Sequence, residues 1–239
     1  RVTQTANALH ELGVGPKDLA LPRDQWSAFL AGAPVVASDV VAKAEDWPAQ
    51  PQYEFLADQM WPATAYGRNA VYDHGHHGNA ILSRHPISHS GNFDMSAHRF
   101  EQRGLLHCVI EPGGAHRVHA LCVHLGLTAR GRRQQYAMLA EHIRTAIPPD
   151  DGLIVAGDFN DWHNRAEEQW SHALGLQEAH SLFHGRPARS FPAAFPLLRL
   201  DRIYVRGVAV REVKLHSGPP WSRVSDHAAL TARLTLGAR

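Results

Sequence analysis

Short apolar runs dominate the pattern of hydrophobic and polar positions along this chain. Runs rich in Val, Ile and Leu that are bounded by Gly, Pro or polar residues predict β-strands. The neighbouring runs 105–111 and 118–123 predict a hairpin, and the runs 198–205 and 208–215 predict a second strand pair. The other predicted strands are 35–42, 80–82, 153–156 and 228–236.

One amphipathic helix is predicted over residues 132–146, where apolar positions recur at helical spacing and Pro148 follows the last of them. Its predicted apolar stripe consists of Met138, Leu139, His142, Ile143 and Ala146. Because strands dominate and helices lie between them, we predict an α/β (α+β) fold. The length of 239 residues fits a single domain over residues 1–239.

The two cysteines lie in the first predicted hairpin. If the glycines after Pro112 centre its turn, Leu105 pairs with Cys122 and Cys108 pairs with His119. The two thiols would then point to opposite faces, so we expect no disulfide. No apolar run approaches the ~18 residues of a membrane span, and no secretory signal is visible. We therefore expect a protein of a reducing compartment, the bacterial cytoplasm.

The net charge argues against partners held by bulk electrostatic attraction. Lys and Arg number 24 and Asp and Glu number 23, which gives +1. Tight binding to nucleic acid or to an anionic membrane by charge alone needs a larger excess. We interpret Arg130, Arg132 and Arg133 as solvated helix charges, with a grip on a phosphate-rich substrate as the alternative. Most of the 18 histidines are interpreted as residues of solvated loops and strand surfaces.

The strongest chemical signal is the sequence Gly157-Asp158-Phe159-Asn160, which follows the apolar run 153–156. Asp158 and Asn160 are two residues apart, so their side chains point to the same side at the end of a strand. A carboxylate there can orient water or hold a hard cation, and an amide can bond a phosphate oxygen. The alternative interpretation is a strand end followed by an Asx-turn.

Other acid and imidazole groups occur near predicted strand ends. Asp226 and His227 are adjacent before the last predicted strand. Asp201 lies in an apolar strand, where a carboxylate needs a partner, and His227 is the partner that we expect. His124 ends a strand close to a glycine, where a ligand can approach. The alternatives are loop polarity for the first pair, a salt bridge to an arginine for Asp201 and a structural role for His124.

The segment 75–84 contains the adjacent histidines His76 and His77. Zinc is not favoured there, because neither a cysteine nor a third histidine at ligand spacing accompanies them. Residues 73–78 are polar and predicted to be flexible, and we interpret the segment 75–84 as a flexible loop that lines a substrate site.

Together these motifs resemble those of the endonuclease/exonuclease/phosphatase family, whose fold is similar to that of DNase I. In chain order they are GNAILSRHPI, CVHLG, GDFND, LDRI and SDH, and the resemblance covers residues 46–239. Segments such as YEFLADQMW and FPLLRLDRIYV are especially similar to a bacterial branch of that family. The resemblance implies a four-layer αββα sandwich of two mixed β-sheets. It also implies attack of water on a phosphoester with Mg²⁺ or Mn²⁺ as cofactor.

The resemblance implies a role for each matched residue. Asp158 would orient and deprotonate the nucleophilic water, and Asn160 would hold a phosphate oxygen. His227, oriented by Asp201, would stabilise the phosphate. His124 would contact the phosphate or the leaving oxygen.

The metal and rim residues are implied in the same way. Asp226 would contact the metal directly or through water, and Asn79 and Arg103 would lie at the rim of the substrate site. The main metal ligand of the family is a Glu in a "QE" motif, which this chain lacks in that form. In one alignment, residues 39–45 match the strand that carries this "QE" motif. Glu45 is then the metal ligand, with an alanine in place of the glutamine.

A second alignment is also open for the N-terminal segment. It places the ligand near residues 30–33, where no carboxylate occurs. In addition, residues 6–18 resemble a segment of adenylate-forming acyl-CoA synthetases. Residues 1–44 are therefore atypical for the family.

The leading hypothesis is a metal-dependent phosphoesterase that hydrolyses a phosphodiester or a phosphomonoester. The near-zero net charge favours a small or lipid-derived substrate over nucleic acid. A nuclease acting on DNA or RNA is the alternative within the same class. A catalytically impaired phosphate-binding module, lacking the metal-ligand Glu, is the alternative from another class. No obligate protein partner is expected.

Overall fold

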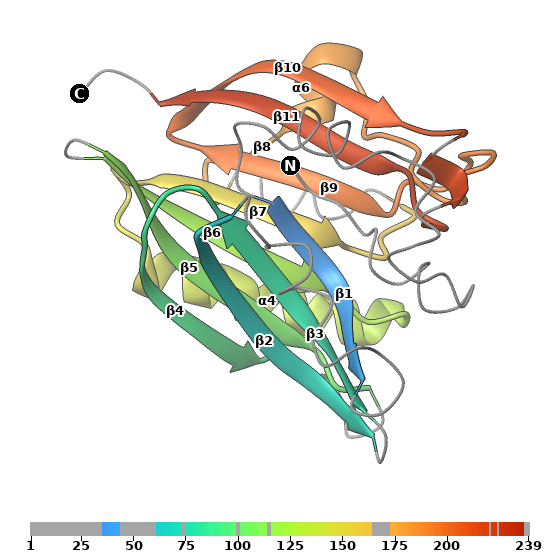
Figure 1. Ribbon diagram of the computed structural model, residues 1–239, viewed down its shortest axis with the longest axis horizontal. Coiled ribbons are helices and arrows are strands. Elements are labelled where there is room, and N and C mark those ends of the chain that lie inside the picture. Colours follow the sequence, from blue (N-terminus) through green and yellow to red (C-terminus); the bar gives the residue numbers. More distant parts are fainter. Residues whose placement is uncertain are drawn as a thin grey trace.

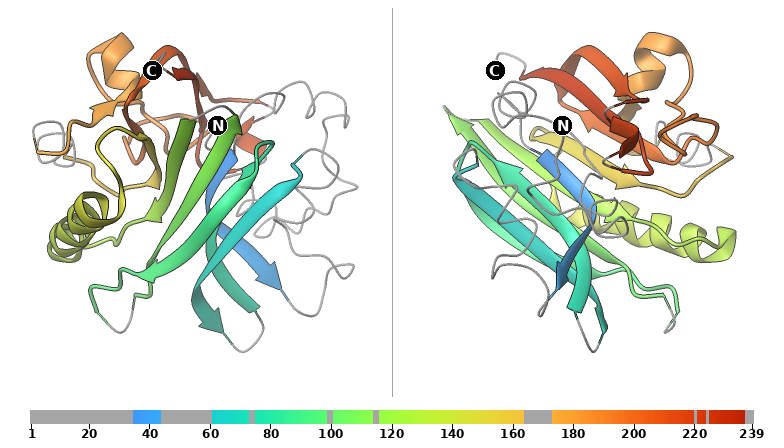
Figure 2. Two further views of the ribbon diagram at one scale, coloured as in Figure 1. Left: turned by 90° about the vertical axis from the view of Figure 1, so that its left-hand side faces the viewer. Right: turned by 45° about the vertical axis from the view of Figure 1, so that its right-hand side comes forward.

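The computed structural model describes residues 35–43, 61–72, 75–98, 101–113, 116–163, 173–219, 221–223 and 225–236, with the backbone alone for 35–43. In this part of the chain two layers of β-sheet face each other (Figure 1). A long helix covers the outer face of the larger layer (Figure 2). None of the helices in these ranges is long and apolar enough to cross a membrane.

The larger layer is a six-stranded sheet in the order β4-β5-β6-β7-β9-β8. β6 and β7 run parallel, and the other neighbouring pairs of this sheet are antiparallel. A parallel pair needs a crossover connection, and helix α4 (Ala129–Ala146) lies in that connection. The strands are β4 (Ile87–Asp94), β5 (Gly104–Gly113), β6 (His116–His124), β7 (Gly152–Asp158), β8 (Gln177–Glu178) and β9 (Asp201–Arg206).

The second layer contains a three-stranded sheet, in the order β1-β3-β2, and the pair β10-β11. All of its described strand pairs are antiparallel. The mixed character that was expected for both sheets is therefore found in the larger one only, within the described strands. The strands are β1 (Val35–Lys43), β2 (Ala63–Tyr72), β3 (Gly75–Ser83), β10 (Val208–His216) and β11 (Ala229–Leu236).

Two apolar cores hold the layers together. The core between the two sheet layers includes Ile81, Ile203 and Leu230. The core between the larger sheet and α4 includes Leu139 and Val155. Successive side chains of the central strands point to opposite faces, so the same short apolar runs supply both cores. Two short helices complete the described part: α6 (Ala179–His184), which packs against β9 and β10, and the 3-10 turn η1 (Trp221–Arg223).

The predicted pairing of 198–205 with 208–215 is wrong, although both strands exist. β9 pairs with β7 and β8, whereas β10 pairs with β11. Gly207 separates β9 from β10 and has a φ of +69°, which glycine adopts without steric cost. The chain therefore passes from the larger sheet to the second layer at this glycine, instead of folding back as a hairpin.

The predicted register of β5 and β6 is wrong by one residue. Cys108 pairs with Ala120 and Leu106 pairs with Cys122, and the register shifts close to the turn. Such an irregularity moves the pairing by one position, which turns side chains to the other face. Both thiols therefore lie in the core between the sheets, and they are free, as expected. Burial raises the pKa of Cys108 to about 12.

The segment 75–78 is not the loop that was expected. β3 begins at Gly75 and pairs with both β1 and β2, so it is the central strand of its sheet. The hydroxyl of Tyr66 on β2 lies 2.8 Å from Nδ1 of His76 on β3. The interpretation of this segment as a flexible substrate-lining loop is therefore wrong.

Helix α4 confirms the predicted helix but buries a different set of side chains. Leu139 and Ile143 are fully buried, as predicted, whereas Met138 is 36% exposed and Ala146 is exposed. The first half of the helix buries polar side chains as well, among them Arg132. The apolar pattern therefore predicted the buried side chains of the second half of α4 but not those of its first half.

Three histidines form a hydrogen-bonded chain between the larger sheet and α4. His142 Nε2 lies 3.0 Å from His107 Nδ1, and His107 Nε2 lies 2.8 Å from His119 Nδ1. His119 Nε2 lies 3.2 Å from an Asp151 carboxylate oxygen, which also accepts from Arg117 Nη2 at 3.1 Å. His107 and His119 are 5% and 4% exposed, so the interpretation of most histidines as surface residues is wrong for these two.

The order of donors and acceptors in this chain follows from its end at a carboxylate. An ionised Asp151 only accepts, so His119 donates to it through Nε2 and its Nδ1 accepts from His107. By the same reasoning His107 Nδ1 accepts from His142. The rings of His119 and His107 are then neutral, with hydrogen on Nε2, and His142 donates through its own Nε2. Burial and the neighbouring histidines lower the pKa of His107 to about 3, and burial also lowers the pKa of His119 and His142.

This chain predicts that the protein loses stability in acid. His107 has a pKa below the ~6.5 of an unfolded histidine, so the unfolded state binds more protons between pH 6.5 and about 3. The free energy of unfolding should therefore fall as the pH is lowered through that window. We expect His107→Gln to flatten this dependence, measured by urea unfolding at pH 7.5, 6, 5 and 4. His85→Gln is the control, because His85 is not one of the hydrogen-bonded histidines. If the free energy of unfolding depends on pH as steeply in His107→Gln as in the wild type, the prediction is wrong.

Candidate active site

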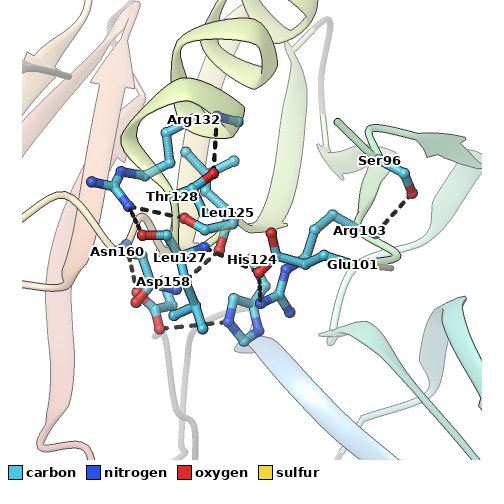
Figure 3. Close-up of polar contacts among 12 residues, drawn as sticks. Ser96, Glu101, Arg103, His124, Leu125, Leu127, Thr128, Arg132, Asp158 and Asn160 are labelled. Carbon is cyan, nitrogen blue, oxygen red and sulfur yellow. Dashed lines mark hydrogen bonds and ion pairs between the residues drawn. The ribbon is translucent and has the colours of Figure 1, made fainter. Parts of the chain in front are cut away.

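Three strand ends of the larger sheet bring chemically reactive side chains into one row. The register of the sheet pairs His124 at the end of β6 with Asp158 at the end of β7. It also pairs Asp158 with Asp201 at the start of β9. Neighbouring strands of a sheet lie about 5 Å apart, so the three residues are close to one another. Figure 3 shows the imidazole of His124 turned toward Asp158.

Asp158 lies at the centre of this row and is only 4% exposed. His124 Nε2 lies 3.7 Å from one of its carboxylate oxygens, and the other accepts a 2.7 Å hydrogen bond from the backbone N–H of Asn160. Burial raises the pKa of Asp158, and the charge of Asp201 adds to this effect, while His124 and His227 oppose it. A raised pKa makes the carboxylate a stronger base, which suits a group that removes a proton from water.

Asn160 is held in an uncommon backbone conformation beside Asp158. Its φ is +49°, which asparagine tolerates better than most residues, and it is 4% exposed. Its side-chain amide donates to the carbonyl of Leu125 at 2.9 Å. The preceding Gly157 has a φ of +140°, and a Cβ there would collide with the carbonyl oxygen of Val123. The glycine therefore lets β6 and β7 approach closely enough to set Asp158 and Asn160 beside the end of β6.

The expected pair of Asp201 and His227 is present. His227 Nδ1 lies 2.8 Å from a carboxylate oxygen of Asp201, which is 2% exposed. Ser190 fixes the position of the acid, because its hydroxyl accepts from the backbone N–H of Asp201 at 3.1 Å. The ring of Phe191 packs against the imidazole of His227, with 4.8 Å between the ring centroids. Nδ1 is thus committed to Asp201, and Nε2 is the nitrogen left for a ligand.

The environment of His227 favours its charged form. Burial by itself lowers the pKa of this histidine. The charge and the hydrogen bond of Asp201, together with the charges of Asp158 and Asp226, outweigh burial and raise the pKa to about 9. His227 is therefore an imidazolium at neutral pH and can stabilise negative charge on a bound anion.

The donor set of the site suits a hard cation and not an enclosed metal centre. Asp226 is exposed beside His227, and Oδ1 of Asp201 is buried without a hydrogen-bond partner among the described residues. In the same part of the chain, no group of three His, Cys, Asp or Glu side chains could hold a metal ion by itself. A cation that keeps most of its water and takes one or two carboxylates fits this arrangement. The predicted ligand Glu45 lies outside the described residues.

The two predicted rim residues differ in their surroundings. Asn79 is fully buried on β3, and its amide donates to the carbonyls of Gly104 and Cys122 at 2.9 and 3.1 Å. It therefore ties the second layer to β5 and β6, and its contact with substrate stays a prediction. Arg103 is partly exposed just before β5 and donates from Nη2 to Glu101 at 3.0 Å.

Several residues that support the site escaped the sequence analysis. Gln135 of α4 accepts from the backbone N–H of Gly126 at 2.8 Å, and Arg132 donates to the carbonyls of Gly126 and Leu127. The interpretation of Arg132 as a solvated charge is therefore wrong, whereas the neighbouring arginines of the cluster are exposed. A helix N-terminal segment rich in polar residues usually faces solvent, so the pattern carried no signal for this role.

Comparison with known sequences agrees with this geometry. The sequence profile described as "Endonuclease/Exonuclease/phosphatase family" matches residues 9–227. A protein of Escherichia coli (strain K12), "Uncharacterized protein YbhP", is 49% identical over 193 residues, which are 80% of this chain and 76% of that protein. The protein of the same name from Shigella flexneri matches to the same extent.

Solved structures share the fold at low sequence identity. An endonuclease/exonuclease/phosphatase from Beutenbergia cavernae superposes with a TM-score of 0.74 at 18% identity, over 99% of this chain and 70% of that one. Danio rerio TDP2 in complex with a single-strand DNA product gives 0.69 at 17% identity, over 98% and 93%. A mannosyl-6-phosphatase from Bacteroides thetaiotaomicron gives 0.62 at 13% identity, over 89% and 91%. The fold is therefore the expected DNase I-like one.

Proposed function

This chain belongs to the endonuclease/exonuclease/phosphatase family and is a phosphoester hydrolase, and we propose that it cleaves its substrate by in-line attack of water with Mg²⁺ or Mn²⁺ bound. The observation that carries the proposal is the row of His124, Asp158 and Asp201 at neighbouring strand ends. His227 joins this row through its bond to Asp201.

Each residue in and beside this row has its own role in the proposed reaction. The water oxygen forms a bond to phosphorus as the bond to the leaving oxygen breaks, and Asp158 takes the proton of the water. Asn160 donates to a non-bridging phosphate oxygen. The imidazolium of His227 offsets the charge that builds on the phosphoryl oxygens, because its pKa of about 9 keeps it protonated. His124 contacts the phosphate or the leaving oxygen.

The divalent cation supplies positive charge that offsets the developing charge of the phosphoryl group when it is bound. Asp226 and Glu45 are the residues that we propose to hold it. Asp226 is exposed and adjacent to His227, so a hydrated cation can reach it. Glu45 supplies the second carboxylate in the alignment that matches residues 39–45 to the strand with the family's "QE" motif.

The metal requirement has a direct test. We expect turnover of a chromogenic phosphodiester, bis(p-nitrophenyl) phosphate, to vanish in EDTA and to return with Mg²⁺ or Mn²⁺. Glu45→Gln and Asp226→Asn should each raise the metal concentration for half-maximal activity by about 10-fold or more. Glu111→Gln, an exposed change on β5, is the control. Turnover that persists in EDTA would contradict the proposal.

For the substrate, we favour a small or lipid-derived phosphoester. The net charge of +1 supports this choice, since binding to a nucleic acid by phosphate contacts needs clustered positive charge. The named structural relatives include one with a DNA product and one that is a mannosyl-6-phosphatase, so the fold serves both kinds of substrate. A nuclease is the second candidate.

The substrate class is tested by comparing kcat/KM for substrates of each class. We expect a glycerophosphodiester to be hydrolysed with a higher kcat/KM than a single-stranded or duplex oligonucleotide, at 150 mM salt. Faster cleavage of the oligonucleotide would favour the nuclease. We also propose the bacterial cytoplasm as the compartment, which the two free cysteines support.

A further inference from the structure

The turn that follows His124 is held by side chains from outside it. Gly126 donates its backbone N–H to Gln135, and its carbonyl accepts from Arg132 at 3.0 Å. Arg132 donates to the carbonyl of Leu127 as well, at 2.6 Å. The N–H of Leu127 donates at 3.0 Å to Glu101. The backbone N–H and carbonyl groups of both Gly126 and Leu127 therefore have partners, and these bonds fix the path of the chain immediately after His124.

Glu101 differs from the other two supports because it does not come from α4. It precedes β5, and its carboxylate packs directly against the turn: a Cβ on Gly126 would come within 2.6 Å of Glu101 Oε2. The side chain of Glu101 is only 15% exposed. The absence of a side chain at Gly126 is thus what allows the carboxylate to reach the N–H of Leu127.

The same carboxylate holds Arg103. Glu101 Oε1 accepts from Arg103 Nη2 at 3.0 Å, and Oε2 lies 3.4 Å from His98 Nε2. Burial acts to raise the pKa of Glu101, but the hydrogen bond from Leu127 and the charge of Arg103 outweigh it and lower the pKa. Glu101 is therefore ionised, and it links the turn after His124 to a guanidinium group.

Arg103 retains donors that no group among the described residues uses. Only Nη2 takes part in the ion pair, and Nε is buried without a hydrogen-bond partner in the part of the chain that the structure describes. The side chain is 16% exposed. Figure 3 shows Arg103 and Glu101 on the side of the turn after His124, and Glu101 connects the two through its bonds to Leu127 and Arg103. A planar guanidinium in that position matches the oxygens of a phosphate.

We propose that Glu101 is a positioning residue, which fixes the turn after His124 and holds Arg103 beside it, so that Arg103 binds the non-reacting oxygens of the phosphoester. This inference rests on the proposed function and deepens it, because it identifies Glu101 as the residue that holds Arg103 in a position to bind the substrate. Arg103 contributes to substrate binding, whereas Glu101 acts through Arg103 and through the backbone of Leu127.

The two contacts of Glu101 can be separated by substitution. Glu101→Gln keeps an oxygen that accepts from Leu127 but removes the charge that holds Arg103. Arg103→Ala removes the guanidinium and leaves the turn in place. The double variant tests whether the first residue acts through the second. Glu141→Gln and Arg144→Ala are the matched controls, because these residues form an exposed pair on α4, with 69% and 53% of their side chains exposed.

Two readouts are measured for each variant. The first is the steady-state KM and kcat for bis(p-nitrophenyl) phosphate with Mg²⁺. The second is the dissociation constant of inorganic phosphate by calorimetry, which needs no turnover. Circular dichroism and the melting temperature report whether each variant is folded.

We expect Arg103→Ala to raise KM and the phosphate dissociation constant by about 10-fold and to change kcat by less than about 3-fold. Glu101→Gln should raise both constants in the same way, by about 5-fold, and Arg103→Lys should restore part of the binding. In the double variant the effects should not add, so its constants should equal those of Arg103→Ala.

Other results would overturn the inference. Unchanged KM and phosphate affinity in a folded Arg103→Ala would exclude Arg103 as the anion-binding group. Additive effects in the double variant would show that Glu101 does not act through Arg103. If the wild type hydrolyses the diester and the variants have its KM and phosphate affinity, the proposed function stands and this inference is wrong. A wild-type protein that neither hydrolyses the diester nor binds phosphate would overturn both.

Discussion

Replacing Asp158 with asparagine is expected to lower kcat by about 10³-fold, because the variant has no base to take the proton of the attacking water. The neighbouring backbone should stay in place, since the amide oxygen of asparagine can still accept from the N–H of Asn160. Burial raises the pKa of Asp158, so its charge is disfavoured in the folded state. The variant should therefore be as stable as the wild type or more stable near neutral pH.

The measurement combines steady-state kinetics on the chromogenic diester with thermal unfolding. Glu111→Gln, an exposed carboxylate on β5, is the control for the loss of one negative charge. A folded Asp158→Asn with wild-type kcat would remove Asp158 from the mechanism. A variant that fails to fold would instead contradict the prediction about stability.

Replacing Asp201 with asparagine is expected to change both the rate and its dependence on pH. In the wild type the pKa of His227 is about 9, so the contribution of the imidazolium persists from neutral pH and is lost as the pH rises through about 9. Without the charge of Asp201, the pKa of His227 should fall by at least about 1 unit. We expect kcat/KM to drop by about 10² to 10⁴-fold at pH 8 and its alkaline limb to move to lower pH.

The stability of the protein gives an independent view of the same pair. The pKa of His227 is raised above the ~6.5 of an unfolded histidine, so the pair stabilises the folded state fully below pH 6.5. This stabilisation should be lost as the pH rises through about 9. Urea unfolding between pH 6 and 10 should therefore show a decline in the wild type and a flatter dependence in Asp201→Asn. An alkaline limb at the same pH in both proteins would mean that His227 is not the group that titrates.

Much of the site was readable in the sequence because it is built from local signals. A buried apolar run followed by Gly157-Asp158-Phe159-Asn160 predicts a strand that ends in polar side chains, and β7 ends at Asp158. Asp201 within an apolar strand predicted a partner, and that partner is His227, at 2.8 Å. Each inference depended on residues within one strand or on the cost of burying a charge.

Contacts between distant side chains could not be predicted from the sequence in the same way. The bond between Glu101 and Leu127 joins residues 26 positions apart, and the bond between His107 and His142 joins residues 35 apart. Such pairs leave no periodic trace, since they depend on how α4 and the segment before β5 dock on the sheet. No pattern in the sequence therefore indicated that His107 and His119 are buried and bonded to each other.

The sequence by itself determined the strands with continuous apolar runs, where the long helix α4 lies and which polar residues end β6 and β7, because these depend on short-range apolar patterns and turn residues. It did not predict the more polar strands β2 and β4 or the first residues of β3. Only the tertiary structure decided that β9 and β10 belong to different layers, that Cys108 faces Ala120 and that β6, β7 and β9 set their ends in one row. Strand pairing and register are fixed by contacts between distant segments, and one shifted residue exchanges the two faces of a strand.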